Sequence, residues 1–177
     1  MSLPHYIDPQ RLAEQQAELA GSYPLAALDR LVSSLHSATG EVTFQLSFGM
    51  SGDRAVVTGQ VATRLPLTCQ RCLRPVSWSV NRDISLGVIL NPDQVADLPD
   101  CYEPLVVAPD GTVALRDIVE DELILELPVV AFHPLAVCPA RDQVSNYGPG
   151  ETEALEELDQ RPNPFAVLQG LKGHLSK

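Results

Sequence analysis

Two cysteines, Cys69 and Cys72, are separated by two residues and lie between two long segments of alternating apolar and polar residues. On a tight turn this spacing can direct both sulfurs towards one ion, which is half of a tetrahedral zinc site. His133 and Cys138 follow a predicted helix with four residues between them and can supply the other two ligands. The sequence therefore predicts zinc as a possible cofactor, with Cys69, Cys72, His133 and Cys138 as its candidate ligands.

Two other interpretations of these cysteines stay open. A lone cysteine is often a small core residue. A C-x-x-C pair can also be a redox centre, although such pairs normally lie at a helix N-terminus after a strand. Cys101 lies in an acidic loop and is not expected to be a ligand. The sequence contains no Walker loop, Rossmann glycine run or nucleophile–base pair, so it indicates a binding protein with no catalytic residues.

The composition predicts one ordinary hydrophobic core in a chain of 177 residues, of which 45% are hydrophobic. No apolar run reaches the roughly 18 residues of a membrane span. The first residues lack the basic and apolar regions of a secretory signal. Four cysteines without an export signal suit a reducing compartment. We therefore expect a cytoplasmic protein that does not associate with membranes.

Charge is distributed unevenly along this acidic chain, whose net charge is −11. Residues 41–90 carry five basic and three acidic side chains, whereas residues 91–150 carry eleven acidic and two basic ones. Because RNA is bound by neutralising its phosphates, any RNA contact should involve the middle segment. Arg64, Arg71 and Arg74 are the candidate RNA contacts. The acidic half suits a basic partner, or it simply keeps the protein soluble.

Strict alternation predicts three antiparallel strands in sequence, over residues 42–48, 57–67 and 76–90. The second and third of these strands should be joined by the cysteine turn. Pro66 predicts an edge or a bulge late in the second strand. Trp78 shares the apolar parity of the third strand, so we expect it in the core.

Helices are predicted on both sides of these strands. Asp8 should cap a helix that begins at Pro9 and ends before Gly21, and a second helix should start at Pro24. Residues 105–114 predict a short hairpin. Residues 115–127 predict a helix, and its four central carboxylates are expected to form a solvated face: Asp117, Glu120, Asp121 and Glu122.

The C-terminal region is predicted to be a flexible acidic linker, residues 139–160, followed by a short helical segment, residues 161–177. Asn163 can cap this helix, with Pro164 at its first position. Its apolar residues Phe165, Leu168 and Leu171 make it a candidate docking segment. The alternative, that it folds back on the core, stays open.

Together these patterns predict an α+β fold. A mainly antiparallel sheet or partial barrel should carry N-terminal helices, one central helix and a short C-terminal helix. The predicted domains are a single α+β domain over residues 1–138, the linker over residues 139–160 and the helical segment over residues 161–177.

Four segments in this order resemble the bacterial large ribosomal RNA subunit accumulation protein (YceD) family. They are LTCQRCLRPV at 67–76, LPDCYEPLVV at 98–107, DIVEDELILELPVV at 117–130 and RPNPFAVLQGLK at 161–172. The resemblance implies a role in accumulation and maturation of large-subunit ribosomal RNA. Many relatives carry a fuller cysteine set after the ELPV segment, where this chain supplies only His133 and Cys138.

The resulting functional prediction is a ribosome biogenesis factor that supports synthesis, processing or accumulation of 23S rRNA by binding and not by catalysis. Its expected partner is large-subunit rRNA or a pre-ribosomal particle, and no small-molecule substrate is expected. The alternative is an acidic escort for a basic large-subunit ribosomal protein. Binding through residues 64–82 would favour the first hypothesis, and binding through residues 93–126 would favour the second.

Overall fold

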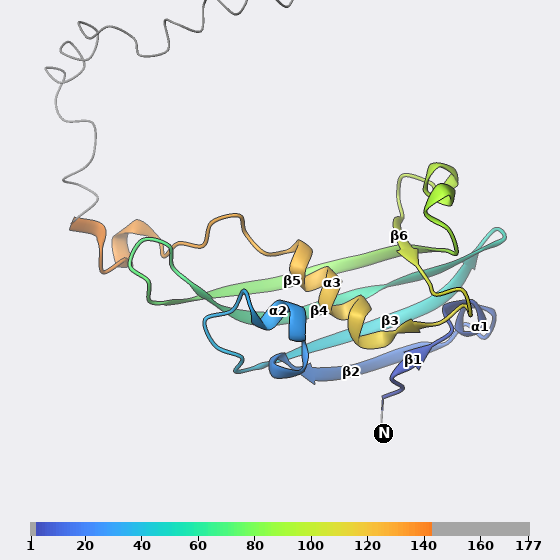
Figure 1. Cartoon of the computed structure of the whole chain (residues 1–177), viewed down its shortest axis with the longest axis horizontal. Helices are drawn as coiled ribbons and strands as arrows, with labels where there is room; N and C mark the ends of the chain where they lie inside the picture. Colours follow the sequence, from blue (N-terminus) through green and yellow to red (C-terminus); the bar gives the residue numbers. More distant parts are fainter. Residues whose placement is uncertain (1–2, 143–177) are drawn as a thin grey trace, which may run out of the picture. The chain divides into compact units, whose positions relative to one another are not determined.

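A five-stranded sheet in the order β2-β3-β4-β5-β6 forms the centre of the first of two units of the chain (Figure 1). The computed structural model describes residues 3–142. The chain divides into two units, Met1–His133 and Pro134–Lys177. The sheet belongs to the first unit. In the described part of the second unit, the 3₁₀ turn η3 spans Leu135–Val137. Within residues 3–142, no helix is both long and apolar enough to cross a membrane.

The three predicted strands are confirmed as β3 (Glu41–Ser51), β4 (Arg54–Thr68) and β5 (Pro75–Ile89). Both neighbouring pairs are antiparallel. Pairing of β3 with β4 ends at Thr63, whereas pairing of β4 with β5 continues to Thr68. The β4–β5 hairpin is therefore longer than its neighbour, and β4 is a local edge at Pro66, as the proline predicted.

The first predicted helix is correct at its start and wrong at its end. Helix α1 spans Pro9–Glu14, and the carboxylate of Asp8 accepts a hydrogen bond from the Arg11 N–H at 3.0 Å. Residues up to Gly21 are not helical, because Glu18–Pro24 forms strand β2 along the free side of β3. Pairing with an exposed strand edge thus outweighs local helix propensity.

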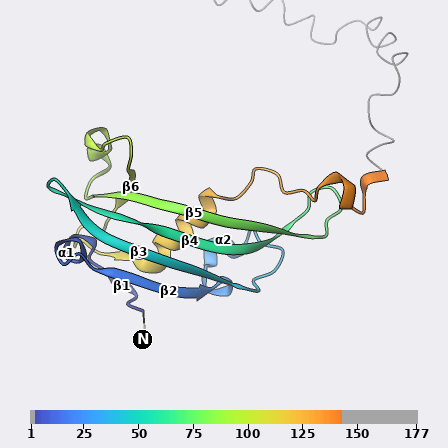
Figure 2. The same ribbon diagram turned by 180° about the vertical axis from the view of Figure 1, so that it is seen from behind.

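Short helical turns and one longer helix pack on the sheet. The predicted helix after Pro24 is divided into the 3₁₀ turn η1 (Leu25–Ala27) and helix α2 (Asp29–Val32). Helix α3 spans Leu115–Leu125, two residues shorter than predicted. Four of the five expected core residues are buried, namely Leu115, Ile118, Val119 and Leu123, whereas Leu127 lies beyond the helix and is half-buried. Helices α2 and α3 lie on the same face of the sheet (Figures 1 and 2). The sheet is open, so the α+β prediction is confirmed without the partial barrel.

The hairpin predicted for residues 105–114 is wrong. Strand β6 (Glu103–Val106) pairs in parallel with β5, and β7 (Val113–Ala114) pairs with β1 (Tyr6–Ile7) in a separate two-stranded sheet. The turn itself forms, since the Ala108 N–H donates to the Thr112 carbonyl at 2.9 Å. Beyond that turn the two arms find partners elsewhere in the chain. The acidic loop before β6 contains the 3₁₀ helix η2 (Pro92–Asp97).

Trp78 is 39% exposed, so the prediction that it lies in the core is wrong. It pairs with the buried Leu65, beyond the last β3 residue that pairs with β4. At this point the β4–β5 hairpin extends beyond the end of β3. An inward-facing side chain there is therefore only partly buried, because no β3 residue pairs with β4 beside it. The alternation of buried and exposed residues also shifts by one position at the other end of β5. There Ile89 is buried and Leu90, which shares the predicted apolar parity, is exposed.

Two of the four α3 carboxylates are buried, so the predicted solvated face is wrong for Glu120 and Glu122. Glu120 accepts hydrogen bonds from the N–H groups of Arg30 and Leu31 at 2.7 and 3.0 Å, which caps helix α2. Glu122 pairs with Arg82, which also binds Glu103 and Glu126. Burial raises the pKa of Glu122, and its hydrogen bond to Arg82 opposes that shift.

Candidate metal centre

The cysteine turn is a tight reversal between β4 and β5. The Cys69 N–H donates to the Arg74 carbonyl at 2.9 Å, and the Leu73 N–H donates to the Cys69 carbonyl at 2.8 Å. Leu73 adopts a φ of 58°, in the left-handed region, which costs a residue with a Cβ atom about 1–2 kcal/mol. This unfavourable backbone conformation occurs in the turn that places Cys69 and Cys72 on the same side.

The segment after α3 brings His133 to this turn. The Gln70 N–H donates to the Ala131 carbonyl at 2.9 Å, which joins the two segments directly. The ligand atoms of Cys69, Cys72 and His133 lie within 4.8 Å of one another, and Cys72 Sγ is 3.4 Å from His133 Nδ1. Tetrahedral zinc with ordinary bond lengths separates a sulfur and a nitrogen ligand by roughly 3.6 Å. The separation of Cys72 Sγ and His133 Nδ1 is therefore close to that of two zinc ligands.

His133 is oriented by its other ring nitrogen. His133 Nε2 lies 3.0 Å from the Pro75 carbonyl oxygen. Because a carbonyl can only accept, Nε2 must carry the proton, and the neutral ring then presents a lone pair at Nδ1. Metal-binding histidines are commonly held in this way, with the second nitrogen donating to a carbonyl. The lone pair faces Cys72 Sγ, as a shared ion would require.

The environment of Cys69 favours a thiolate. Its side chain is fully buried, and burial raises the pKa of a thiol. Hydrogen bonds from the backbone N–H groups of His133, Cys72 and Arg71 oppose burial, and together they lower the pKa of Cys69 to about 5. A deprotonated sulfur is the form that binds zinc. A β-hairpin turn is not the usual place for a redox pair, so the structure favours metal over redox chemistry.

Cys138 lies in the second unit, five residues after His133 and directly after η3. Five residues span at most about 18 Å, so chain connectivity keeps this cysteine within reach of the other three ligands. The assignment of Cys138 as the fourth ligand is a proposal. Cys101 is exposed in the loop before β6 and does not belong to the group of described side chains whose ligand atoms lie together.

The three candidate RNA-contact arginines do not form one patch. Arg74 is exposed in the cysteine turn, and Arg64, next to the inward-facing Leu65, lies on the opposite, open face of the sheet. The Arg71 guanidinium lies 4.7 Å from the centre of the Phe132 ring, and its Nη1 atom is buried without a hydrogen-bond partner. The Arg71 side chain therefore packs partly against Phe132 and is not fully available to RNA. Its position in a turn did not indicate this.

Exposed apolar side chains close to the turn were not predicted as functional. One of them is Trp78. The segment that leads to His133 exposes three more: Val129, Val130 and Phe132. The unequal lengths of the alternating segments could have indicated Trp78, whereas no local pattern marks Phe132. The predicted docking residues, Asn163, Pro164, Phe165, Leu168 and Leu171, lie outside the described residues, as does the linker from residue 143 onwards.

Comparisons with known proteins agree with the resemblance of the four sequence segments. The family model described as "Large ribosomal RNA subunit accumulation protein YceD" matches residues 57–172, which include all four candidate ligands. A protein of that name from Haemophilus influenzae is 36% identical over 175 residues, which covers 97% of each chain. No solved structure matches the chain significantly.

Proposed function

Because the chain belongs to the large ribosomal RNA subunit accumulation protein YceD family, we propose that it is a cytoplasmic ribosome biogenesis factor that binds large-subunit rRNA or its precursor particle. The family name supports a role in accumulation of large-subunit rRNA. Binding, and not catalysis, is our proposal for how the chain performs that role. Its site is the cysteine-turn end of the β4–β5 hairpin.

The charge of this hairpin is the observation that carries the proposal. Residues 54–82 contain five arginines and no acidic residue, in a chain whose net charge is −11. Arg82 is neutralised by three glutamates, and Arg54 lies at the far end of β4. Of the remaining three, Arg71 and Arg74 lie in the cysteine turn, and Arg64 lies five residues before Cys69 on the open face of β4. They do not form one patch, but each can meet a phosphate at this end of the hairpin without a carboxylate beside it in sequence.

Zinc held by Cys69, Cys72, His133 and Cys138 would act as a structural cross-link. It would join the β4–β5 turn to the segment after α3, and it would fix the positions of Arg71 and Arg74. The exposed ring of Trp78 is on the same hairpin and can stack with unpaired bases, as single-stranded RNA requires. We retain the C-terminal helical segment, residues 161–177, as a second candidate contact with the particle.

Single substitutions of the exposed arginines should weaken RNA binding with little effect on folding. We expect Arg74→Gln and Arg64→Gln each to lower the affinity for transcribed 23S rRNA fragments severalfold. Each should also reduce the slope of log K against log salt by roughly 0.7–0.9, because one phosphate contact is lost. Filter binding between 50 and 200 mM salt measures both quantities.

Arg11→Gln is the matched control, since it removes one exposed arginine from helix α1. Its affinity and salt slope should equal those of the wild type. Equal losses in all three variants would show that only net charge matters. Unchanged RNA binding in both hairpin variants would contradict the proposed site.

A further inference from the structure

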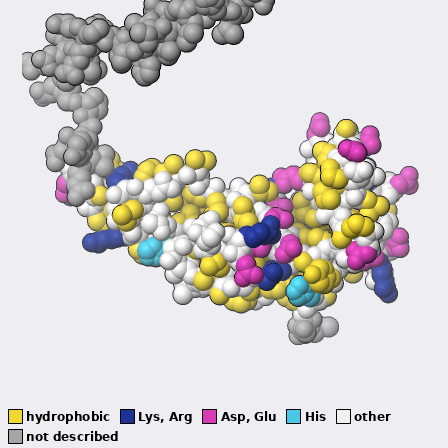
Figure 3. All heavy atoms as spheres, viewed as in Figure 1, with side chains coloured by type: hydrophobic (Ala, Val, Ile, Leu, Met, Phe, Trp, Pro, Cys, Tyr) yellow, Lys and Arg dark blue, Asp and Glu magenta, His cyan; other side chains and the backbone are white. Residues whose placement is uncertain are grey.

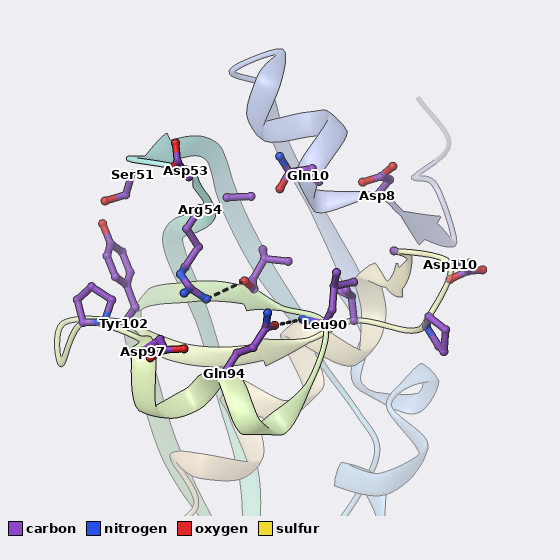
Figure 4. Close-up of a pocket in the computed structure, with 16 residues that line it drawn as sticks. Asp8, Gln10, Ser51, Asp53, Arg54, Leu90, Gln94, Asp97, Tyr102 and Asp110 are labelled. Carbon is purple, nitrogen blue, oxygen red and sulfur yellow. Dashed lines mark hydrogen bonds between the residues drawn. The ribbon is translucent and has the colours of Figure 1, made fainter.

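A hollow of about 740 Å³ opens at the end of β4 farthest from the cysteine turn (Figure 4). Its walls come from five places in the first unit: the start of α1, the β3–β4 turn, the end of β5, the η2 loop and residues 107–111. We propose that this hollow binds an arginine- or lysine-rich peptide segment of a protein partner.

Carboxylates outnumber cations in the hollow. Asp8, Asp53, Asp97 and Asp110 line it, and Arg54 is the one cationic side chain among the lining residues. The Arg54 guanidinium donates to the Val88 carbonyl at 3.5 Å, and no ion pair within residues 3–142 joins it to the four aspartates. The hollow thus carries an unneutralised charge of about −3, which a cationic ligand would complement.

Two of these carboxylates are held in place by the backbone. Asp8 Oδ1 accepts the Arg11 N–H, and Asp110 Oδ1 accepts both the N–H and the hydroxyl of Thr112. The hydrogen bonds from Thr112 lower the pKa of Asp110, so this side chain stays ionised. The second oxygen of each carboxylate takes no part in these bonds. The rim of the hollow is therefore partly organised before a ligand arrives.

The spread of the charges favours a peptide over a single ion. Among the described residues, the one group whose ligand atoms converge as a metal site requires is the cysteine–histidine cluster. Asp53, Asp97, Asp8 and Asp110 instead lie apart around the rim (Figure 4). Cations spaced along a chain can meet carboxylates arranged in this way, whereas one ion cannot. The volume is in the usual range of about 300–1,000 Å³ for ligand sites.

Apolar side chains between the carboxylates suit the stems of lysine and arginine. Leu90 is exposed in the lining, and Val88 and Tyr102 are half-buried there. Long basic side chains place their methylene groups on such surfaces and keep the charged group at the polar rim. Charge and apolar surface are thus combined as a basic peptide requires.

The hollow and the cysteine turn are at opposite ends of one strand. The 15 residues of β4 separate them by about 45 Å, and acidic side chains gather at the η2–β6 end (Figure 3). A basic peptide at one end and RNA at the other would not compete for space. The proposed peptide site therefore does not depend on the RNA contact. It is a binding site for the basic partner that the acidic composition of residues 91–150 suggested.

Fluorescence anisotropy of the full-length protein with a labelled nine-residue arginine–lysine peptide tests the proposal. At 50 mM salt the wild type should bind, and a peptide with glutamine at the basic positions should not. The double variant Asp53→Asn/Asp97→Asn removes two exposed carboxylates of the hollow. It should weaken binding at least tenfold without a change in melting temperature.

The matched control is Glu18→Gln/Glu41→Gln, which removes two exposed carboxylates from β2 and β3, outside the hollow. It should bind within twofold of the wild type. Equal weakening in both double variants would overturn the proposal, because net charge alone would explain it. Displacement of the peptide by micromolar spermidine would also overturn it, in favour of a small polyamine. Binding of 23S rRNA fragments is measured separately and should be unchanged in the Asp53→Asn/Asp97→Asn variant.

Discussion

Chelation of the purified protein should release about one zinc ion per chain and lower the melting temperature by about 8 °C or more. Structural zinc contributes directly to folding, because the assembled ligand set does not exist in the unfolded chain. We expect a loss of at least about 4 kcal/mol, which corresponds to roughly 8–16 °C for a chain of this length. Elemental analysis and thermal melts before and after chelation measure both effects.

Single substitutions should identify the ligands. Cys69→Ser, Cys72→Ser, His133→Ala and Cys138→Ser should each reduce zinc content and stability, whereas Cys101→Ser should change neither. Full zinc occupancy in Cys138→Ser would show that the fourth ligand is another group. Protein purified without zinc that binds none when zinc is added would contradict the site. Cys69 would then be a buried core residue only.

Glu120→Ala should destabilise the protein by about 3 kcal/mol. The substitution leaves the N–H groups of Arg30 and Leu31 without their acceptor and removes the partner of the Arg30 guanidinium. Loss of a buried acceptor costs about 1–3 kcal/mol for each group left unsatisfied, and more when the bond is charged. Urea denaturation followed by circular dichroism measures the change in free energy of unfolding.

Asp121→Ala is the matched control for Glu120. Asp121 also binds Arg30, but both side chains of that pair are more than half exposed. Exposed ion pairs contribute about 0–1 kcal/mol, so Asp121→Ala should have little effect on stability. Similar losses of stability in the two variants would show that the Arg30 ion pair is important and the cap on α2 is not.

Local patterns predicted the parts of the fold that depend on neighbouring residues. Alternation in residues 42–48 and 57–67 specifies β3 and β4, because one face of each strand is buried. Strand β2 and the buried state of Glu120 were not predictable in this way. Both depend on partners chosen by the tertiary fold, and Glu120 meets Arg30 across 90 residues.

The candidate metal centre was partly encoded in the chain. The spacing of Cys69 and Cys72 indicated the ligand pair, and the structure brings His133 to it across more than 60 residues. The tautomer of His133 depends on the Pro75 carbonyl, which no motif reveals. The hollow was not predicted, since its five segments share no pattern and only their packing creates it.

Ultraviolet crosslinking of the intact tagged protein in growing cells tests the central claim most directly. Sequencing of the bound RNA and mass spectrometry of the crosslinked peptides give the RNA and the protein surface together. Our account predicts enrichment of 23S rRNA precursor over 16S rRNA, with crosslinked peptides from residues 64–78. Equal recovery of both rRNAs, or crosslinks only within residues 93–126, would contradict RNA binding by the cysteine-turn end of the hairpin.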